Sequence, residues 1–158
     1  MRLPQGGHAG VRRRQRSADR RRHAQGDHLN ARIEHVALWV RDLEAVAAFY
    51  ARWFGARIGE RYENPRKKFA SRFVEFAGGA RLEVMTRVDV DSRSAGEQLG
   101  LAHIAIAVGD EAAVDALAKR FAAEGIAILD GPRRTGDGYY ECVVRDPEGN
   151  RVEIAAGR

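Results

Sequence analysis

Two histidines and two glutamates occupy matching places in the two halves of this sequence. His35 precedes Glu83 by 48 residues, and His103 precedes Glu153 by 50. Imidazole nitrogens and carboxylate oxygens bind divalent first-row metals, and four such ligands leave positions open for water or substrate. The pattern predicts one metal site built from these four side chains. Taken singly, each could be a hydrogen-bonded strand histidine or a solvated glutamate, but four repeat-equivalent residues favour the metal site.

The phase of the predicted strands supports this grouping. Side chains alternate across a strand, so His35 and His103 each share a face with small alanines. Glu83 and Glu153 point away from the apolar residues on either side of them, which are expected to pack beneath a helix. All four groups are therefore expected on faces that no helix covers, where the alanines leave room for a concavity.

The elements that must position these residues occur twice, each time as a strand, a helix and three further strands. We therefore predict an α+β fold with two tandem βαβββ modules in a domain over residues 32–158. The first module spans about 33–88, a polar linker spans 89–100, and the second module spans about 101–156. The expected elements are strands at 33–40, 56–62, 69–77 and 80–86 with a helix at 42–55, then strands at 101–108, 126–131, 139–146 and 150–156 with a helix at 109–125.

Basic charge is concentrated in an extension at residues 1–31. The chain has 158 residues and a net charge of +5, but residues 1–32 contain nine arginines and only two aspartates, leaving −2 for the remainder. The extension has few large apolar residues and is expected to be disordered. An arginine arm that contacts phosphates is one interpretation, but no aromatic residues accompany the arginines, so nucleic-acid binding is not expected.

Composition excludes several other classes of protein. No apolar stretch approaches the roughly 20 residues of a membrane-spanning helix, and the basic start is not followed by the apolar segment of a secretory signal. A cytoplasmic protein without a membrane partner is therefore expected. The single cysteine, Cys142, excludes an intramolecular disulfide and a thiolate metal cluster.

Several segments together resemble the vicinal oxygen chelate superfamily, also called the glyoxalase/bleomycin resistance/dioxygenase family. The similar segments are IEHVALWVRDLEAVAAFYARWFGA, ENP, ARLEVM, LAHIAIAV and DPEGNRVEI, and the resemblance covers about residues 33–156. It is most similar to glyoxalase I, or lactoylglutathione lyase. The resemblance implies a curved mixed sheet around a metal, often completed across a homodimer.

The same resemblance assigns roles to the four repeated residues. His35, Glu83, His103 and Glu153 match the His, Glu, His, Glu metal set of glyoxalase I, which implies one divalent ion: nickel, cobalt, zinc or manganese. The implied reaction is isomerisation of the hemithioacetal of a 2-oxoaldehyde and a thiol, through an enediolate, to a 2-hydroxyacyl thioester. The expected base is Glu153, with Glu83 as the alternative.

Two substrate-binding positions differ from the glyoxalase I pattern. Trp39 and Arg87 stand where small bacterial glyoxalase I has the Arg and Asn that serve glutathione, so either glutathione or another thiol is the expected partner molecule. Arg41 and the basic segment 66–68 are further candidates for anion contacts. Other interpretations stay open: an epimerase or dioxygenase of the same superfamily, or a non-catalytic protein that binds a drug or metabolite.

Overall fold

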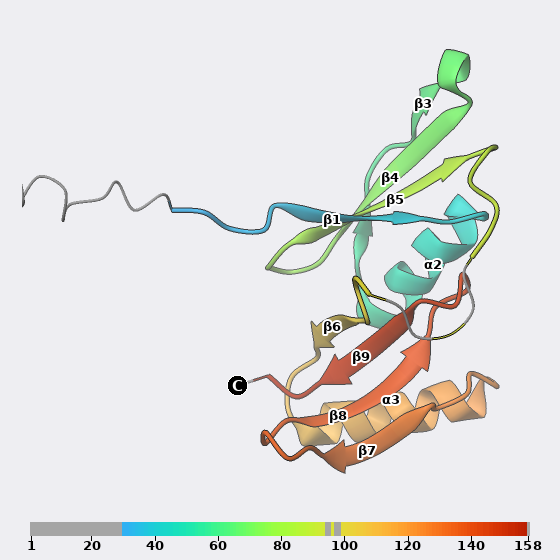
Figure 1. Cartoon of the computed structure of the whole chain (residues 1–158). Helices are drawn as coiled ribbons and strands as arrows, with labels where there is room; N and C mark the ends of the chain where they lie inside the picture. The colour runs from blue at the N-terminus through green and yellow to red at the C-terminus, as the bar shows by residue number, and fades with distance from the viewer. Residues whose placement is uncertain (1–29, 94–95, 97–98, 158) are drawn as a thin grey trace, which may run out of the picture. The chain divides into compact units, whose positions relative to one another are not determined.

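The computed structural model describes residues 30–93, 96 and 99–157 (Figure 1). Residues Ile33–Arg158 form one compact unit. Nearly all of the extension expected to be disordered, and part of the expected linker 89–100, lie outside the described residues. Within the compact unit the chain builds two modules in succession, each a mixed sheet with one long helix.

The first module confirms the predicted order, with one additional strand. Its elements are β1 (His35–Trp39), α2 (Leu43–Phe54), β2 (Arg57–Ile58), β3 (Tyr62–Asn64), the short 3₁₀ helix η1 (Pro65–Lys67), β4 (Phe69–Glu75) and β5 (Arg81–Arg87). The strand order is β1-β5-β4-β2, and β3 also pairs with β4. β1 runs parallel to β5, and the other pairs are antiparallel.

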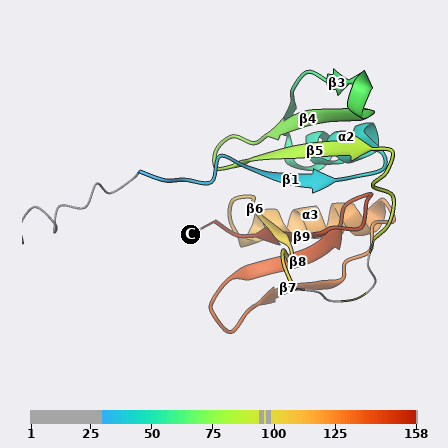
Figure 2. The same ribbon diagram turned by 45° about the horizontal axis from the view of Figure 1, so that its top comes forward.

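The second module repeats this plan. Its elements are β6 (Ile104–Ala107), α3 (Glu111–Ala123), β7 (Asp130–Arg134), β8 (Tyr140–Arg145) and β9 (Arg151–Ala155). The strand order is β6-β9-β8-β7, with β6 parallel to β9. The curved mixed sheet of the prediction is thus a pair of sheets, one per module, and β1 and β6 lie at their neighbouring borders (Figure 2).

Two predicted strands differ from those observed. The strand expected at 56–62 is divided into β2 and β3. The strand expected at 126–131 begins only at Asp130, because the backbone N–H of Ile126 donates to Phe121 at the end of α3 (2.9 Å), while the N–H of Leu129 already donates to Val143 of β8 (2.8 Å). Backbone hydrogen bonds to a helix end compete with strand pairing, and apolar composition alone does not distinguish the two.

Both helices begin and end as the sequence suggests. The side chains of Asp42 and Asp110 accept hydrogen bonds from backbone N–H groups three residues later, at 2.9 and 3.0 Å. These contacts satisfy donors that a helix start leaves free. Gly55 and Gly125 follow α2 and α3 with φ angles of 64° and 77°, a left-handed conformation that glycine adopts without steric cost.

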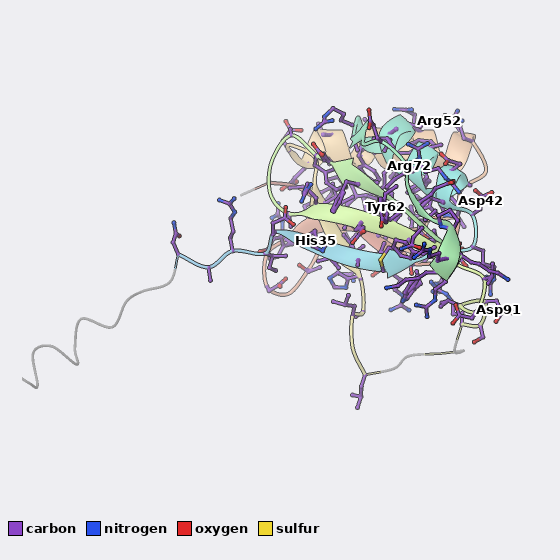
Figure 3. The ribbon with its side chains drawn as sticks, turned by 90° about the horizontal axis from the view of Figure 1, so that it is seen from above. His35, Asp42, Arg52, Tyr62, Arg72 and Asp91 are labelled. Carbon is purple, nitrogen blue, oxygen red and sulfur yellow. The ribbon has the colours of Figure 1, made fainter. Side chains whose placement is uncertain are left out.

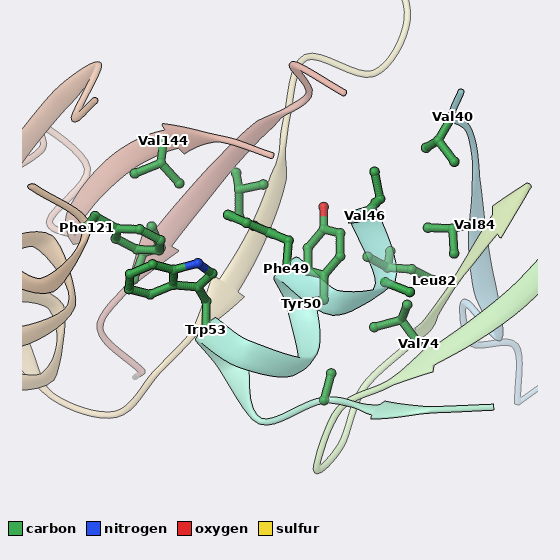
Figure 4. Packing of buried hydrophobic residues seen from close by; sticks show 14 of the residues in the cluster. Val40, Val46, Phe49, Tyr50, Trp53, Val74, Leu82, Val84, Phe121 and Val144 are labelled. Carbon is green, nitrogen blue, oxygen red and sulfur yellow. The ribbon is translucent and has the colours of Figure 1, made fainter. Parts of the chain in front are cut away.

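The two helices contribute to a common aromatic core (Figure 4). Trp53 of α2 stacks on Phe121 of α3 with ring centroids 4.1 Å apart, and Phe49 lies 6.3 Å from the same ring. Trp53 and Phe121 are 6% and 0% exposed. Burying rings of this size is among the largest single contributions that a side chain makes to stability. The modules are therefore held together by their helices, which leaves the opposite sheet faces open.

Polar contacts also join the modules. Arg41, two residues after the end of β1, binds Glu148 of the second module through its guanidinium (2.7 Å) and its backbone N–H (2.6 Å). Its guanidinium also donates to the carbonyl of Asp91. The Tyr50 hydroxyl donates to Asp146 at 3.3 Å, and burial beside this carboxylate raises the pKa of Tyr50. Arg41, considered above for anion contacts, is therefore engaged in a structural contact.

No helix within the described ranges is long and apolar enough to cross a membrane.

Candidate metal centre

The first pair of candidate ligands lies on the sheet of the first module. His35 is the first residue of β1, labelled in Figure 3, and Glu83 lies in the neighbouring strand β5. The parallel register pairs Ala37 with Glu83, two residues beyond His35. Because residues two apart share a face, His35 and Glu83 become diagonal neighbours, with His35 Nε2 3.8 Å from Glu83 Oε2.

The second pair repeats this arrangement. His103 immediately precedes β6, and Glu153 lies in β9. Here Ala105 is paired with Glu153, again two residues beyond the histidine, and His103 Nε2 lies 3.4 Å from Glu153 Oε2. The repeat noticed in the sequence is therefore a repeat of geometry, since each module pairs one imidazole nitrogen with one carboxylate oxygen.

The two pairs have similar exposure. The imidazoles of His35 and His103 are 40% and 46% exposed, whereas the carboxylates of Glu83 and Glu153 are 19% and 17% exposed. Each glutamate is thus partly shielded by the sheet, and each histidine lies at the border of its sheet. Partly shielded carboxylates beside accessible imidazoles can receive a ligand from solvent without large rearrangement.

Neighbouring charges orient the first histidine. His35 Nδ1 contacts the carboxylate of Glu34, which also forms an ion pair with Arg81. The pKa of Glu34 is lowered by the hydrogen bond with His35 and by Arg81. Arg81 lies 4.0 Å over the ring of Phe73, whose edge meets His35 at a centroid separation of 5.6 Å. A partner on Nδ1 leaves Nε2 directed toward Glu83, the usual arrangement of a histidine whose other nitrogen binds a metal.

Glu141 is a further site residue that the sequence reasoning missed. It lies in β8 and is 9% exposed, in a cavity of about 280 Å³ shared with His103, Arg133 and Glu153. Its pKa is raised by burial and by hydrogen bonding to Glu153 and the charge of that carboxylate. One signal was available in the sequence: strand alternation places Glu141 on the face opposite buried Cys142, with the outward residues of the second module.

Each His–Glu pair has the spacing of half a metal coordination shell. Two donors about 2.1 Å from one ion, separated by 90° to 109°, lie about 3.0–3.4 Å apart. The Nε2–Oε2 separations of 3.4 and 3.8 Å are close to that range. However, among the residues that the structure describes, no three His, Cys, Asp or Glu side chains gather closely enough to hold a metal ion. The described part of one chain therefore holds two separate His–Glu pairs, and the structure does not bring the four predicted ligands to a common point.

The two candidate substrate residues do lie together. The guanidinium of Arg87 lies 5.0 Å from the centroid of the Trp39 ring, and its Nε pairs with Asp89 at 2.5 Å. Both share the sheet face of His35 and Glu83, toward the other end of the strands. Two residues not predicted for the site continue this surface, because the Phe69 ring meets the edges of both Trp39 and Tyr62 at 6.1 Å.

Comparisons with known proteins agree on a single family. Residues 32–154 match the family model described as Glyoxalase/Bleomycin resistance protein/Dioxygenase superfamily. The uncharacterized protein PA2024 of Pseudomonas aeruginosa is 34% identical over 134 residues, which is 80% of this chain and 89% of that protein.

Solved structures extend the comparison to the fold. The lactoylglutathione lyase of Agrobacterium tumefaciens is 27% identical with a TM-score of 0.60, covering 82% of this chain and 96% of that one. The trypanothione-dependent glyoxalase I of Leishmania major is 23% identical with a TM-score of 0.65, covering 80% and 87%, and this likeness concerns the fold. With its paired modules and repeated His–Glu pairs, the chain belongs to the glyoxalase/bleomycin resistance protein/dioxygenase superfamily.

Proposed function

We propose that this protein is a metal-dependent isomerase of the glyoxalase I type, acting on the hemithioacetal of a 2-oxoaldehyde and a thiol. The observation that supports this most directly is the pair of equivalent half-sites, His35 with Glu83 and His103 with Glu153. Two imidazoles and two carboxylates suit nickel, cobalt, zinc or manganese. Retention of glutamate in both modules favours isomerase chemistry, since it provides two carboxylates that could move a proton.

The half-sites are completed, in this proposal, by a symmetric homodimer. The pair His35–Glu83 of one copy meets the pair His103–Glu153 of the other, and the twofold axis generates a second such site. Two observations support this. Among the strands that the structure describes, β1 and β6 each pair on one side only. A cavity of about 800 Å³ between their borders is lined in part by Ile33 and Leu101, which are 68% and 74% exposed. Exposed apolar side chains beside open strand edges are typical of an interface.

The residues have distinct roles in the reaction. His35, Glu83, His103 and Glu153 would hold a divalent ion, whose Lewis acidity would acidify the C–H bond next to the substrate carbonyl. Glu153 takes that proton and returns it to the neighbouring carbon, while Glu83 and the two histidines hold the ion. Glu141 lines the same cavity as Glu153, and burial together with that neighbouring carboxylate raises the pKa of Glu141.

Metal reconstitution tests the proposal. The purified chain is stripped with a chelator, reloaded separately with nickel, cobalt, zinc and manganese, and assayed with methylglyoxal and glutathione and with other aldehyde and thiol pairs. One ion per chain and thioester formation that depends on the ion are expected. Because Trp39 and Arg87 depart from the glutathione pattern, the glutathione adduct should saturate the enzyme only weakly.

The alternatives give different outcomes. A metal-loaded protein that forms no thioester with any pair would contradict the isomerase and favour an epimerase or dioxygenase of the same superfamily. A protein that binds no metal at all would favour a non-catalytic drug- or metabolite-binding function.

A further inference from the structure

Four side chains from four strands form a continuous surface on the sheet of the first module. Trp39 comes from β1, Arg87 from β5, Phe69 from β4 and Tyr62 from β3. Arg87 lies over Trp39 at 5.0 Å, Trp39 meets Phe69 at 6.1 Å, and Phe69 meets Tyr62 at 6.1 Å. We call these four residues the aromatic row.

The aromatic row is open to solvent, which is unusual for side chains of this kind. Trp39 and Tyr62 are 39% and 57% exposed, in contrast to Trp53 and Tyr50, which are 6% and 0% exposed in the core. Large aromatic surfaces that stay exposed and contiguous commonly mark binding sites. Trp39 and Tyr62 therefore present exposed aromatic surface to a ligand, on either side of the half-buried Phe69 ring.

Positive charge accompanies the row at one end. Arg87 contributes a guanidinium, and Phe69 follows directly after Lys68, which makes no ion pair with any residue that the structure describes. Lys68, Phe69 and Arg87 also line a cavity of about 490 Å³ that contains Arg41 and Arg61 as well, against the two carboxylates of Glu63 and Asp91. Arg41, Arg61 and Arg87 are each paired with a carboxylate. Among the described residues of this cavity, Lys68 is therefore the cation left to pair with an anionic ligand.

The row lies within reach of a substrate held at the His–Glu pair. Trp39 is four residues beyond His35 on β1, and Arg87 is four residues beyond Glu83 on β5. Strands rise about 3.3 Å per residue, so the row lies roughly 13 Å along the same sheet face. A molecule of two or three linked groups spans that distance, with its reacting end at the half-site.

We propose that the aromatic row is a subsite for an aromatic carboxylate group at the non-reacting end of the substrate. A planar ring packs against the exposed rings of Trp39 and Tyr62, which meet Phe69 edge to face. Its carboxylate pairs with Lys68 and competes with Asp89 for Arg87. The inference rests on the proposed function only in assigning this group to the same molecule that reaches the His–Glu pair.

The combination of surfaces favours this ligand class over others. A neutral aromatic molecule would leave Lys68 without a partner, and a flexible aliphatic acid would leave the exposed surfaces of Trp39 and Tyr62 in water. Arg87 already lies over an aromatic ring, so a second ring beside it gains both stacking and charge contacts. A second copy of this chain would need an acidic apolar surface to cover the row, and that occupant is distinguished by the experiment.

Calorimetric titration of the full chain, with metal absent, tests the subsite directly. Four probes separate the contributions: 2-naphthoate is planar and anionic, 2-naphthalenemethanol is planar and neutral, cyclohexanecarboxylate is anionic without a planar ring, and S-methylglutathione is anionic and flexible. We expect 2-naphthoate to bind at least about tenfold more tightly than each of the other three, because only it uses both surfaces.

Variants locate the binding. Trp39→Leu and Arg87→Met should each weaken 2-naphthoate at least about tenfold. Arg57→Met, which removes an arginine paired with Glu75 elsewhere on the same sheet, should change it less than about twofold. In a Trp53→Phe background Trp39 is the sole tryptophan, and 2-naphthoate should quench its fluorescence. If that background fails to fold, the calorimetry on the wild-type chain still decides the question.

Several results would overturn the subsite. One is equal affinity for 2-naphthoate and for either 2-naphthalenemethanol or cyclohexanecarboxylate. Another is that Arg57→Met weakens 2-naphthoate binding as much as Trp39→Leu or Arg87→Met does. A third is tighter binding of S-methylglutathione that Trp39→Leu does not affect. If 2-naphthoate fails to bind and Trp39 fluorescence changes on dilution, the occupant of the aromatic row is a second copy of this chain. Because no metal is present, naphthoate binding without isomerase activity refutes only the proposed reaction, and isomerase activity without naphthoate binding refutes only this subsite.

Discussion

A metal site shared between two copies predicts that two inactive variants restore each other. His35→Ala damages one half-site and His103→Ala damages the other, and each homodimer then lacks one ligand in both of its sites. Loss of an outer-shell partner typically costs a metal site 10- to 100-fold, so loss of a ligand should lower activity at least about 100-fold. The mixed dimer differs from both parents because both lesions fall in the same site.

The expected magnitude follows from the geometry. The second site of the mixed dimer combines the intact His35–Glu83 pair of one copy with the intact His103–Glu153 pair of the other. One of two sites is then complete, so the mixed dimer should show about half of the wild-type activity per dimer. Co-expression of the two variants with different tags, followed by tandem affinity purification, isolates that species for the thioester assay and metal analysis.

A matched control uses two lesions in the same half-site. His35→Ala paired with Glu83→Ala leaves each site of the mixed dimer with one damaged half, so activity should stay at the level of the parents. Absence of recovery with His35→Ala and His103→Ala, in a mixed dimer shown to be intact, would refute a site shared between copies. It would require the two half-sites of one chain to close around a single ion.

Four further predictions concern catalysis, stability and accessibility. Glu153→Gln should lower turnover by about 100-fold or more with little loss of metal affinity, because an amide keeps one oxygen donor but accepts no proton; Glu83→Ala, which removes a ligand oxygen, should lower both together, and a large loss of turnover alone in Glu83→Gln would make Glu83 the base. Trp53→Ala should lower the free energy of unfolding by about 3–5 kcal/mol in a denaturant titration, because it removes the ring stacked on Phe121, whereas exposed Trp39→Ala should cost under about 1.5 kcal/mol, and equal losses would contradict the assigned core. Burial raises the pKa of the Cys142 thiol to about 11, so at pH 8 the native chain should react with a disulfide reagent more than about 100-fold more slowly than the unfolded chain; equal rates would show that this strand opens readily. A chain beginning at Asn30 should keep the melting temperature within about 2 °C and the metal stoichiometry of the full chain, as expected for an extension with few apolar residues, and a large loss of either would make residues 1–29 part of the fold.

Local patterns in the sequence were sufficient for the ends of both helices and for the sheet face on which the paired residues lie. Asp42 and Asp110 cap the helices, and glycines at 55 and 125 end them, because capping depends on side chains within a few positions of the helix terminus. Alternation along a strand also determines which residues share a face, so the outward phase of Glu83 and Glu153 could be predicted before their partners were known.

Tertiary structure decided everything that depends on which strands become neighbours. The sequence contains no local signal that β1 lies beside β5, so the 3.8 Å contact between His35 and Glu83 required the sheet register. Glu141 acquires its raised pKa only when β8 lies against β9 and brings it to Glu153. The aromatic row likewise unites Trp39, Phe69 and Tyr62 from three separate strands. Pairing between residues far apart in the chain determines the distances between strands. The two modules pack through their helices, where Trp53 stacks on Phe121, so the two His–Glu pairs of one chain stay apart among the described residues.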